Sequence, residues 1–169
     1  MQKGFATLEI ILITFIIAVL VSAAVPNAVR MIDRVALDYE TKKLYTDMRF
    51  LQSFERMTSM NDSHFPATER DEKIIMYIYP ERCVVQNDST NKIYSEKFFS
   101  YGVTAEKNSE NEIWKIQFDD MGKPKNKDDK SISDSLKLTS RLQKDSYIVF
   151  DSVGRFRGSR EKKSEEWTD

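Results

Sequence analysis

The chain has 169 residues, 31% of them charged, and its 26 basic and 27 acidic side chains leave a net charge of −1. This balance gives no overall field that would favour nucleic acid. A single cysteine excludes an intramolecular disulfide, and a single histidine leaves no partners for a histidine-based metal site or catalytic triad. The length suits one globular domain and is too short for two.

An apolar run opens the chain. Residues 5–25 contain one charged residue, Glu9, among many leucine, isoleucine, valine and phenylalanine residues. As an α-helix this segment is about 30 Å long, which matches the hydrocarbon core of a bilayer. We therefore expect one membrane-spanning helix at 5–25, with Lys3 and the amino terminus on the cytoplasmic side. A carboxylate in hydrocarbon costs about 2.5–3.5 kcal/mol, so Glu9 needs a partner or a function.

Two simpler interpretations of this segment stay open. It can be a plain membrane anchor in which Glu9 has no role. It can also be a secretory signal peptide, because Ser22 and Ala23 are small residues of the kind found at a cleavage site. Under these alternatives the chain would be a membrane-anchored or secreted binding domain with a conventional signal sequence, and DNA would be a candidate ligand.

Residues 3–9 read Lys-Gly-Phe-Ala-Thr-Leu-Glu, and this segment resembles the processing site of type IV pilins and type II secretion pseudopilins. The resemblance implies a leader peptide at 1–4, cleavage by a prepilin peptidase between Gly4 and Phe5, and N-methylation of Phe5. Glu9, fifth after the cut, would face the terminal amine of a neighbouring subunit during filament assembly. Pro26 stands where many members of the family carry a helix-kinking proline.

The function implied by this resemblance is structural. The chain would be a minor pilin or pseudopilin that assembles into a type IV pilus-like filament for protein secretion, pilus biogenesis or DNA uptake. Its partners would be the prepilin peptidase, other pilin or pseudopilin subunits and the inner-membrane assembly platform. It would be a single-pass protein of the inner membrane with its C-terminal domain outside the cytoplasm. We expect no enzymatic activity, no catalytic residue, no metal and no cofactor.

The helix is expected to continue through residues 26–60 as an amphipathic segment. Apolar residues recur there at three- and four-residue spacing in two adjacent stripes, Leu37, Leu44, Met48 and Leu51 beside Phe50, Phe54 and Met57. We expect this apolar side to pack on a sheet. Most charged residues fall on other faces, namely Asp38, Glu40, Lys42, Lys43, Asp47, Arg49 and Glu55. Pro26 should bend the rod, because its ring clashes with the carbonyl of Ser22.

Residues 61–169 are expected to form an antiparallel β-sheet domain. Short β-branched and aromatic runs separated by turn residues predict strands at 74–79, 82–86, 92–99, 101–106, 112–118, 135–139 and 147–150. Short spacings between them favour hairpins over crossover helices. The predicted fold class is therefore α+β, a long N-terminal helix packed on an antiparallel sheet, as in pilins.

Two segments share the form Phe-Asp-x-x-Gly, at 118–122 and at 150–154. Their glycines, Gly122 and Gly154, fit turns that require a positive φ. A Phe-x-x-x-Gly turn and a Gly-Arg pair after the final strand are similar to features of H-type pseudopilins and T-type minor pilins. Within the family, the chain most resembles this group.

Three further features have simple explanations. Cys83 lies in a predicted strand and is expected to be a small buried hydrophobe. The acid pairs Asp119-Asp120 and Asp128-Asp129 lack the spacing of a calcium loop and are expected to be solvated. A basic C-terminal cluster, Arg155, Arg157, Arg160, Lys162 and Lys163, is interrupted by glutamates, and nucleic acid is not expected as a partner.

Overall fold

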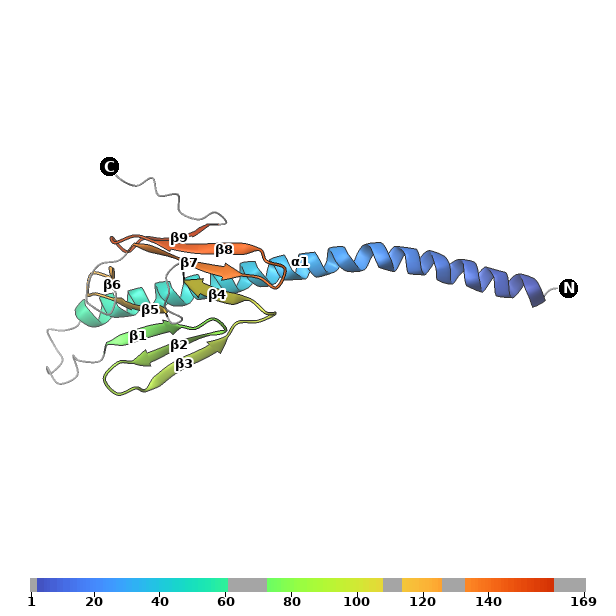
Figure 1. Ribbon diagram of the computed structural model, residues 1–169. Helices are drawn as coiled ribbons and strands as arrows, with labels where there is room; N and C mark the ends of the chain where they lie inside the picture. The colour runs from blue at the N-terminus through green and yellow to red at the C-terminus, as the bar shows by residue number, and fades with distance from the viewer. Residues whose placement is uncertain (1–2, 61–72, 108–113, 126–132, 160–169) are drawn as a thin grey trace, which may run out of the picture.

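The computed structural model describes residues 3–60, 73–107, 114–125 and 133–159 (Figure 1). One long helix, α1, runs over Lys3–Met60. The described strands follow it and pair only in antiparallel ladders. The expected α+β fold class, one N-terminal helix packed on antiparallel β-structure, is confirmed.

The strands form two sheets where a single sheet was expected. The first has the order β3-β2-β1-β5-β6, and the second has the order β4-β7-β8-β9. In the first sheet the strands are β1 (Ile74–Ile78), β2 (Arg82–Asn87), β3 (Ile93–Phe98), β5 (Trp114–Phe118) and β6 (Pro124–Lys125). In the second they are β4 (Thr104–Lys107), β7 (Asp134–Thr139), β8 (Asp145–Phe150) and β9 (Phe156–Ser159). Figure 1 shows both sheets against the C-terminal half of α1, whereas the N-terminal half projects away from them.

The prediction that both apolar stripes of α1 pack on β-structure is only partly confirmed. Leu37, Leu44, Met48 and Leu51 are all buried, with at most 4% of each side chain exposed. The neighbouring stripe faces solvent, because Phe50 is 70% and Met57 68% exposed. Counting Phe50, Phe54 and Met57 in the packed face was therefore wrong. The two sheets contact a narrower arc of the helix than the full apolar surface.

A single core joins the helix to both sheets. Met48 of α1, Ile116 of the first sheet and Ile148 of the second are each fully buried. The rings of Trp114 and Phe150, one from each sheet, lie with their centroids 5.0 Å apart. Each large apolar side chain buried in this way contributes about 1.5–3 kcal/mol. The two sheets therefore form one domain around α1.

Most expected strands are present, several with shifted ends, and residues 112–113 of the strand expected at 112–118 lie outside the described residues. The strand expected at 101–106 begins later, because Tyr101 and Gly102 both adopt positive φ, +56° and +70°, in a turn before β4. The short edge strand β6 and the last strand β9 were not predicted. Because β9 follows Gly154 and Arg155, that Gly-Arg pair precedes the last strand of the described residues and does not follow it.

Candidate functional site: the apolar arm and its attachment to the sheets

The first half of α1 makes no buried contact with the sheets. Every described side chain from residue 7 to residue 32 is exposed, and Asp33 is the first buried one. We call residues 3–32 the arm. It is long and apolar enough to be a membrane span or a signal sequence. Water is a poor environment for its exposed leucine, isoleucine and valine side chains, which nothing in the described residues covers.

Polar side chains on the arm bond to the backbone of their own helix. Thr14 Oγ1 donates to the Ile11 carbonyl at 3.0 Å, and Ser22 Oγ donates to the Val19 carbonyl at 2.8 Å. Such bonds satisfy the hydroxyls without water and suit an apolar surrounding. Glu9 differs, since its exposed carboxylate has no hydrogen bond or ion pair within the described residues. It is the one charged group on residues 5–25.

The other residues predicted from the leader resemblance also lie on the arm. Gly4 and Phe5 belong to the first turns of α1, and Glu9 follows one turn after Phe5. Pro26 lies inside α1, and the helix continues through it. Next to Pro26, the Asn27 side-chain amide donates to the Ala23 carbonyl at 3.2 Å, which satisfies one acceptor beside the interruption. The kink at Pro26 and the roles of Gly4, Phe5 and Glu9 stay predictions.

Carboxylates on α1 attach the helix to the sheets at seven-residue intervals. Asp33 accepts from Ser140 Oγ at 2.7 Å and from the Leu142 N–H at 3.3 Å. Glu40 accepts from the Ser100 N–H at 3.1 Å, and Asp47 accepts from Lys97 Nζ at 2.7 Å. Glu40 is only 1% exposed, although the sequence pattern placed it on a charged face. The sequence interpretation missed these attachments, and the spacing 33, 40, 47 was the available signal.

The two Phe-Asp-x-x-Gly segments form the same turn. In each, the aspartate carboxylate accepts two backbone N–H groups of its own turn, those of Met121 and Lys123 on Asp119 and those of Val153 and Arg155 on Asp151. The expected positive φ of the glycines is confirmed, at +73° for Gly122 and +89° for Gly154. We call this pair of turns, one from each sheet, the twin turns.

One glutamine of α1 joins the twin turns. The side-chain amide of Gln52, which is 2% exposed, donates to the Gly122 carbonyl at 2.6 Å and to the Gly154 carbonyl at 2.7 Å. A Cβ on Gly154 would lie 2.4 Å from the Gly122 carbonyl oxygen, so only glycine permits this approach. The helix thus fixes the two sheets to each other at this end.

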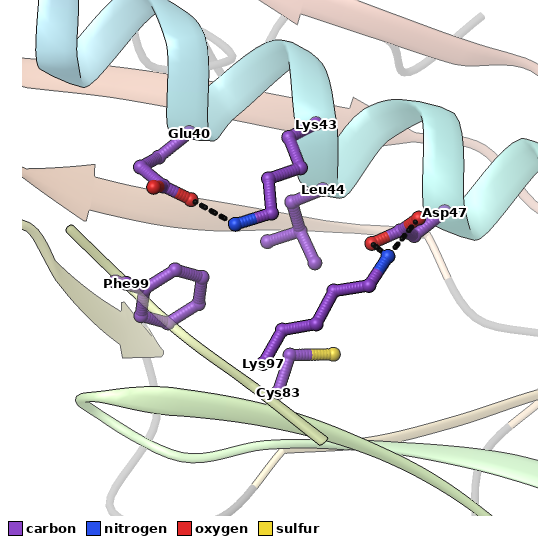
Figure 2. Close-up of a pocket in the computed structure, with 7 residues that line it drawn as sticks. All are labelled: Glu40, Lys43, Leu44, Asp47, Cys83, Lys97 and Phe99. Atoms are coloured by element: carbon purple, nitrogen blue, oxygen red, sulfur yellow. Dashed lines mark hydrogen bonds and ion pairs between the residues drawn. The ribbon is translucent and has the colours of Figure 1, made fainter. Parts of the chain in front are cut away.

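Cys83 lies in a pocket between α1 and the first sheet (Figure 2). The residues that line it are Glu40, Lys43, Leu44, Asp47, Cys83, Lys97 and Phe99. Burial and, to a smaller extent, the nearby Asp47 carboxylate raise the pKa of the Cys83 thiol to about 12. The thiol is therefore protonated and unreactive at neutral pH, which supports its interpretation as a small buried hydrophobe.

The remaining candidates have local partners or lie outside the described residues. The Asp119 carboxylate accepts a backbone N–H of its own turn, and Asp128-Asp129 lies outside the described residues. In the described part of the chain, no three acidic, histidine or cysteine side chains gather where they could hold a metal. Arg155 pairs with Asp151 at 2.8 Å, whereas residues 160–163 of the basic cluster are not described.

Comparison of the chain with protein-family models, with curated proteins and with solved structures found no significant match to any of them. The architecture itself is pilin-like, because a long N-terminal apolar helix extends beyond the domain and packs its second half against antiparallel sheets.

Proposed function

We propose that this chain is a minor pilin or pseudopilin, a structural subunit of a type IV pilus-like filament. One observation carries the proposal: the arm is apolar and exposed along its length, and its single carboxylate, Glu9, lacks a partner within the described residues. A surface of this kind requires an apolar environment that supplies one positive charge. A bilayer supplies the first requirement, and a bundle of arms from neighbouring subunits supplies both.

The proposed chemistry begins at the leader. Cleavage after Gly4 by the prepilin peptidase would create a new amine at Phe5, which is then N-methylated. In the filament, Glu9 of one subunit would pair with the Phe5 amine of the next. Breaking a buried ion pair by removing one partner costs about 3–5 kcal/mol, so a misplaced subunit with an unpaired Glu9 is strongly disfavoured. Glu9 would thereby set the axial position of each subunit.

The location and the partners follow from this function. Before assembly the arm would span the inner membrane, and the sheet domain would lie outside the cytoplasm. Assembly would require the inner-membrane platform and other pilin or pseudopilin subunits. The twin turns support placement in the H-type and T-type group, because a Phe-x-x-x-Gly turn is part of that resemblance. The proposed role is structural, without catalysis and without nucleic acid as a partner.

The first test is the mass of the native protein. Processing after Gly4 gives a protein that begins at methylated Phe5, and Gly4→Ser should leave a precursor heavier by the leader. A terminus at Met1 would contradict processing and favour a plain anchor. A terminus beyond Ala23 would identify a signal peptide and favour a secreted binding domain, because the arm carries none of the buried contacts of the domain.

The second test concerns Glu9. We expect Glu9→Ala and Glu9→Gln to leave expression and leader cleavage intact and to reduce incorporation into filaments at least tenfold, since either change leaves an amine unpaired in the arm bundle. Recovery of the variant with purified filaments measures incorporation. Glu81→Ala, an exposed acid of the sheet domain, is the matched control. Normal incorporation of both Glu9 variants would contradict the pairing.

A further inference from the structure

The end of the domain that faces the arm combines cations with exposed apolar groups. Asp33 of α1 holds the β7–β8 turn at residues 140–144 through Ser140 and Leu142. Arg30 and Arg34 lie within one helical turn of Asp33, and the β7–β8 turn carries Arg141 and Lys144. In Figure 1 this turn lies at the end of the domain from which the arm emerges.

A second turn adds an aromatic side chain to the same end. A Cβ placed on Gly102 would lie 3.7 Å from the Cβ of Arg141, so the turn that contains Tyr101 adjoins the β7–β8 turn. Tyr101 is 71% exposed and Leu142 is 41% exposed. We define the arm-proximal face as Arg30, Arg34, Tyr101, Arg141, Leu142 and Lys144.

The face keeps a net positive charge because its four cations, Arg30, Arg34, Arg141 and Lys144, outnumber the nearby carboxylates that have no cation of their own. Asp33 is buried and accepts a hydrogen bond from Ser140 in the β7–β8 turn. Glu40 is also buried, accepts from the Ser100 N–H and forms an ion pair with Lys43. Asp145 accepts from Thr139 Oγ1 at 3.0 Å and lies 3.5 Å from Lys137. In contrast, Arg30 and Arg34 are exposed and have no ion pair within the described part of the chain.

We propose that the arm-proximal face binds the phosphates of anionic phospholipid headgroups on the side of the bilayer where the domain lies. The inference rests on the proposed function only in requiring that residues 5–25 span a membrane. Arginine donates paired hydrogen bonds to phosphate, and tyrosine favours the interface between hydrocarbon and water. Each cation near an anionic surface contributes about 1 kcal/mol.

The length of the helix supports this contact. Asp33 lies eight residues beyond Val25, which is about 12 Å along a helix. The headgroup region extends about 5–7 Å beyond the hydrocarbon core, and a helix tilt of about 20° lowers the domain further. Arginine side chains can span the remaining gap. Exposed Val29 and Ile32, on either side of Arg30, continue the apolar surface of the arm.

The test measures how close the face lies to the headgroups. The full chain carrying a fluorescent label on Thr104→Cys is reconstituted into vesicles that contain headgroup-spin-labelled lipid as a quencher. Cys83 stays in place because its buried thiol does not react. We expect stronger quenching in vesicles of phosphatidylcholine with phosphatidylglycerol than in phosphatidylcholine alone, and a loss of this difference at high salt.

Charge removal identifies the residues responsible. The triple variant Arg30→Gln, Arg34→Gln, Arg141→Gln should lower the ratio of docked to undocked domain roughly fivefold per arginine. The matched control removes three exposed cations elsewhere, with Lys92→Gln, Arg155→Gln and Arg157→Gln, and should retain the quenching.

Each outcome has one meaning. Equal quenching with and without phosphatidylglycerol, or in the variant and its parent, would overturn lipid binding and leave the proposed filament function untouched. Quenching that depends on protein density and not on lipid charge would assign the face to a second copy and also overturn the proposal. Loss of the chain from vesicles on alkaline washing would refute the membrane span, and with it both proposals.

Discussion

The two halves of α1 have opposite surroundings, and the N-terminal half is also the more apolar of the two. Leu20 on the arm is 63% exposed, whereas Leu44 in the packed half is 2% exposed. The difference lies in the partner, because the sheets of the same chain cover the second half and nothing in the described chain covers the first. A single helix can therefore belong to two environments. Its packed half stabilises the domain, and its arm is long and apolar enough to be a membrane span or a signal sequence.

Polar side chains show the same division. On the arm, Thr14 and Ser22 bond to carbonyls of their own helix. In the packed half, Asp33, Glu40 and Gln52 reach across to backbone or side-chain groups of the sheets. Within residues 5–25, Thr14 and Ser22 need no hydrogen-bond partner beyond their own helix and Glu9 is the one charged group, so this segment meets the condition for entering hydrocarbon except at Glu9. The packed half uses its polar groups to fix the position of each sheet.

The largest expected effect is on the free energy of unfolding, when a leucine is replaced by alanine in each half of α1. Leu44→Ala removes a buried side chain from the core and should lower the free energy of unfolding by roughly 3 kcal/mol, from lost burial and a residual cavity. Leu20→Ala on the arm should change it by less than about 0.5 kcal/mol. Denaturant unfolding in detergent, followed by fluorescence of the buried Trp114, measures both. A comparable loss in the two variants would show that the arm is part of the folded domain.

A smaller effect is expected at the junction of the twin turns. Gln52→Ala removes the two hydrogen bonds to the twin turns and the bond from the Arg49 guanidinium to Gln52 Oε1, and it leaves the buried carbonyls of Gly122 and Gly154 without this donor. We expect a loss of about 2 kcal/mol in unfolding free energy. Ser53→Ala, on the next residue, removes only an exposed bond to the Arg49 carbonyl and should be nearly neutral. If Gln52→Ala were as mild as its control, the glutamine would not hold the sheets together.

Local patterns in the sequence account for much of this fold. The apolar run at 5–25, the buried stripe from Leu37 to Leu51 and the β-branched strands each predict their own element. The repeated Phe-Asp-x-x-Gly form predicts two glycines with positive φ, because this sequence is typical of a local turn. Each of these features depends on residues that are close in the sequence, so one sequence is enough to predict it.

The remainder depends on contacts between distant residues. Nothing near Gln52 shows that its amide meets carbonyls 70 and 102 positions away. The exposure of Phe50 and Met57 follows from how much of the helix the two sheets cover, and helical periodicity does not specify that arc. The division of the strands into two sheets likewise follows from pairing across the chain. The roles of Gly4, Phe5 and Glu9 involve other molecules, so they stay predictions.

The smallest expected effect is a pH dependence in the packed half. Burial raises the pKa of Glu55, the Ile74 N–H that donates to it at 3.3 Å offsets part of the rise, and the Asp120 and Lys73 charges act in opposite directions. Because its pKa is higher in the folded state than in the unfolded one, protonation favours folding. The stability of the wild type relative to Glu55→Gln should therefore increase as the pH falls through the folded pKa and level off below the unfolded pKa.

Unfolding titrations of both proteins from neutral to acidic pH measure this difference. Glu81→Gln, on an exposed residue, is the control and should follow the wild type at every pH. The carboxylates that accept hydrogen bonds from the sheets, such as Asp33 and Asp47, are present in all three proteins, so their contributions cancel in the comparison. A relative stability that fell on acidification would mean that the Ile74 bond outweighs burial at Glu55, and that this carboxylate attaches α1 to β1 as Asp33 attaches it to the β7–β8 turn.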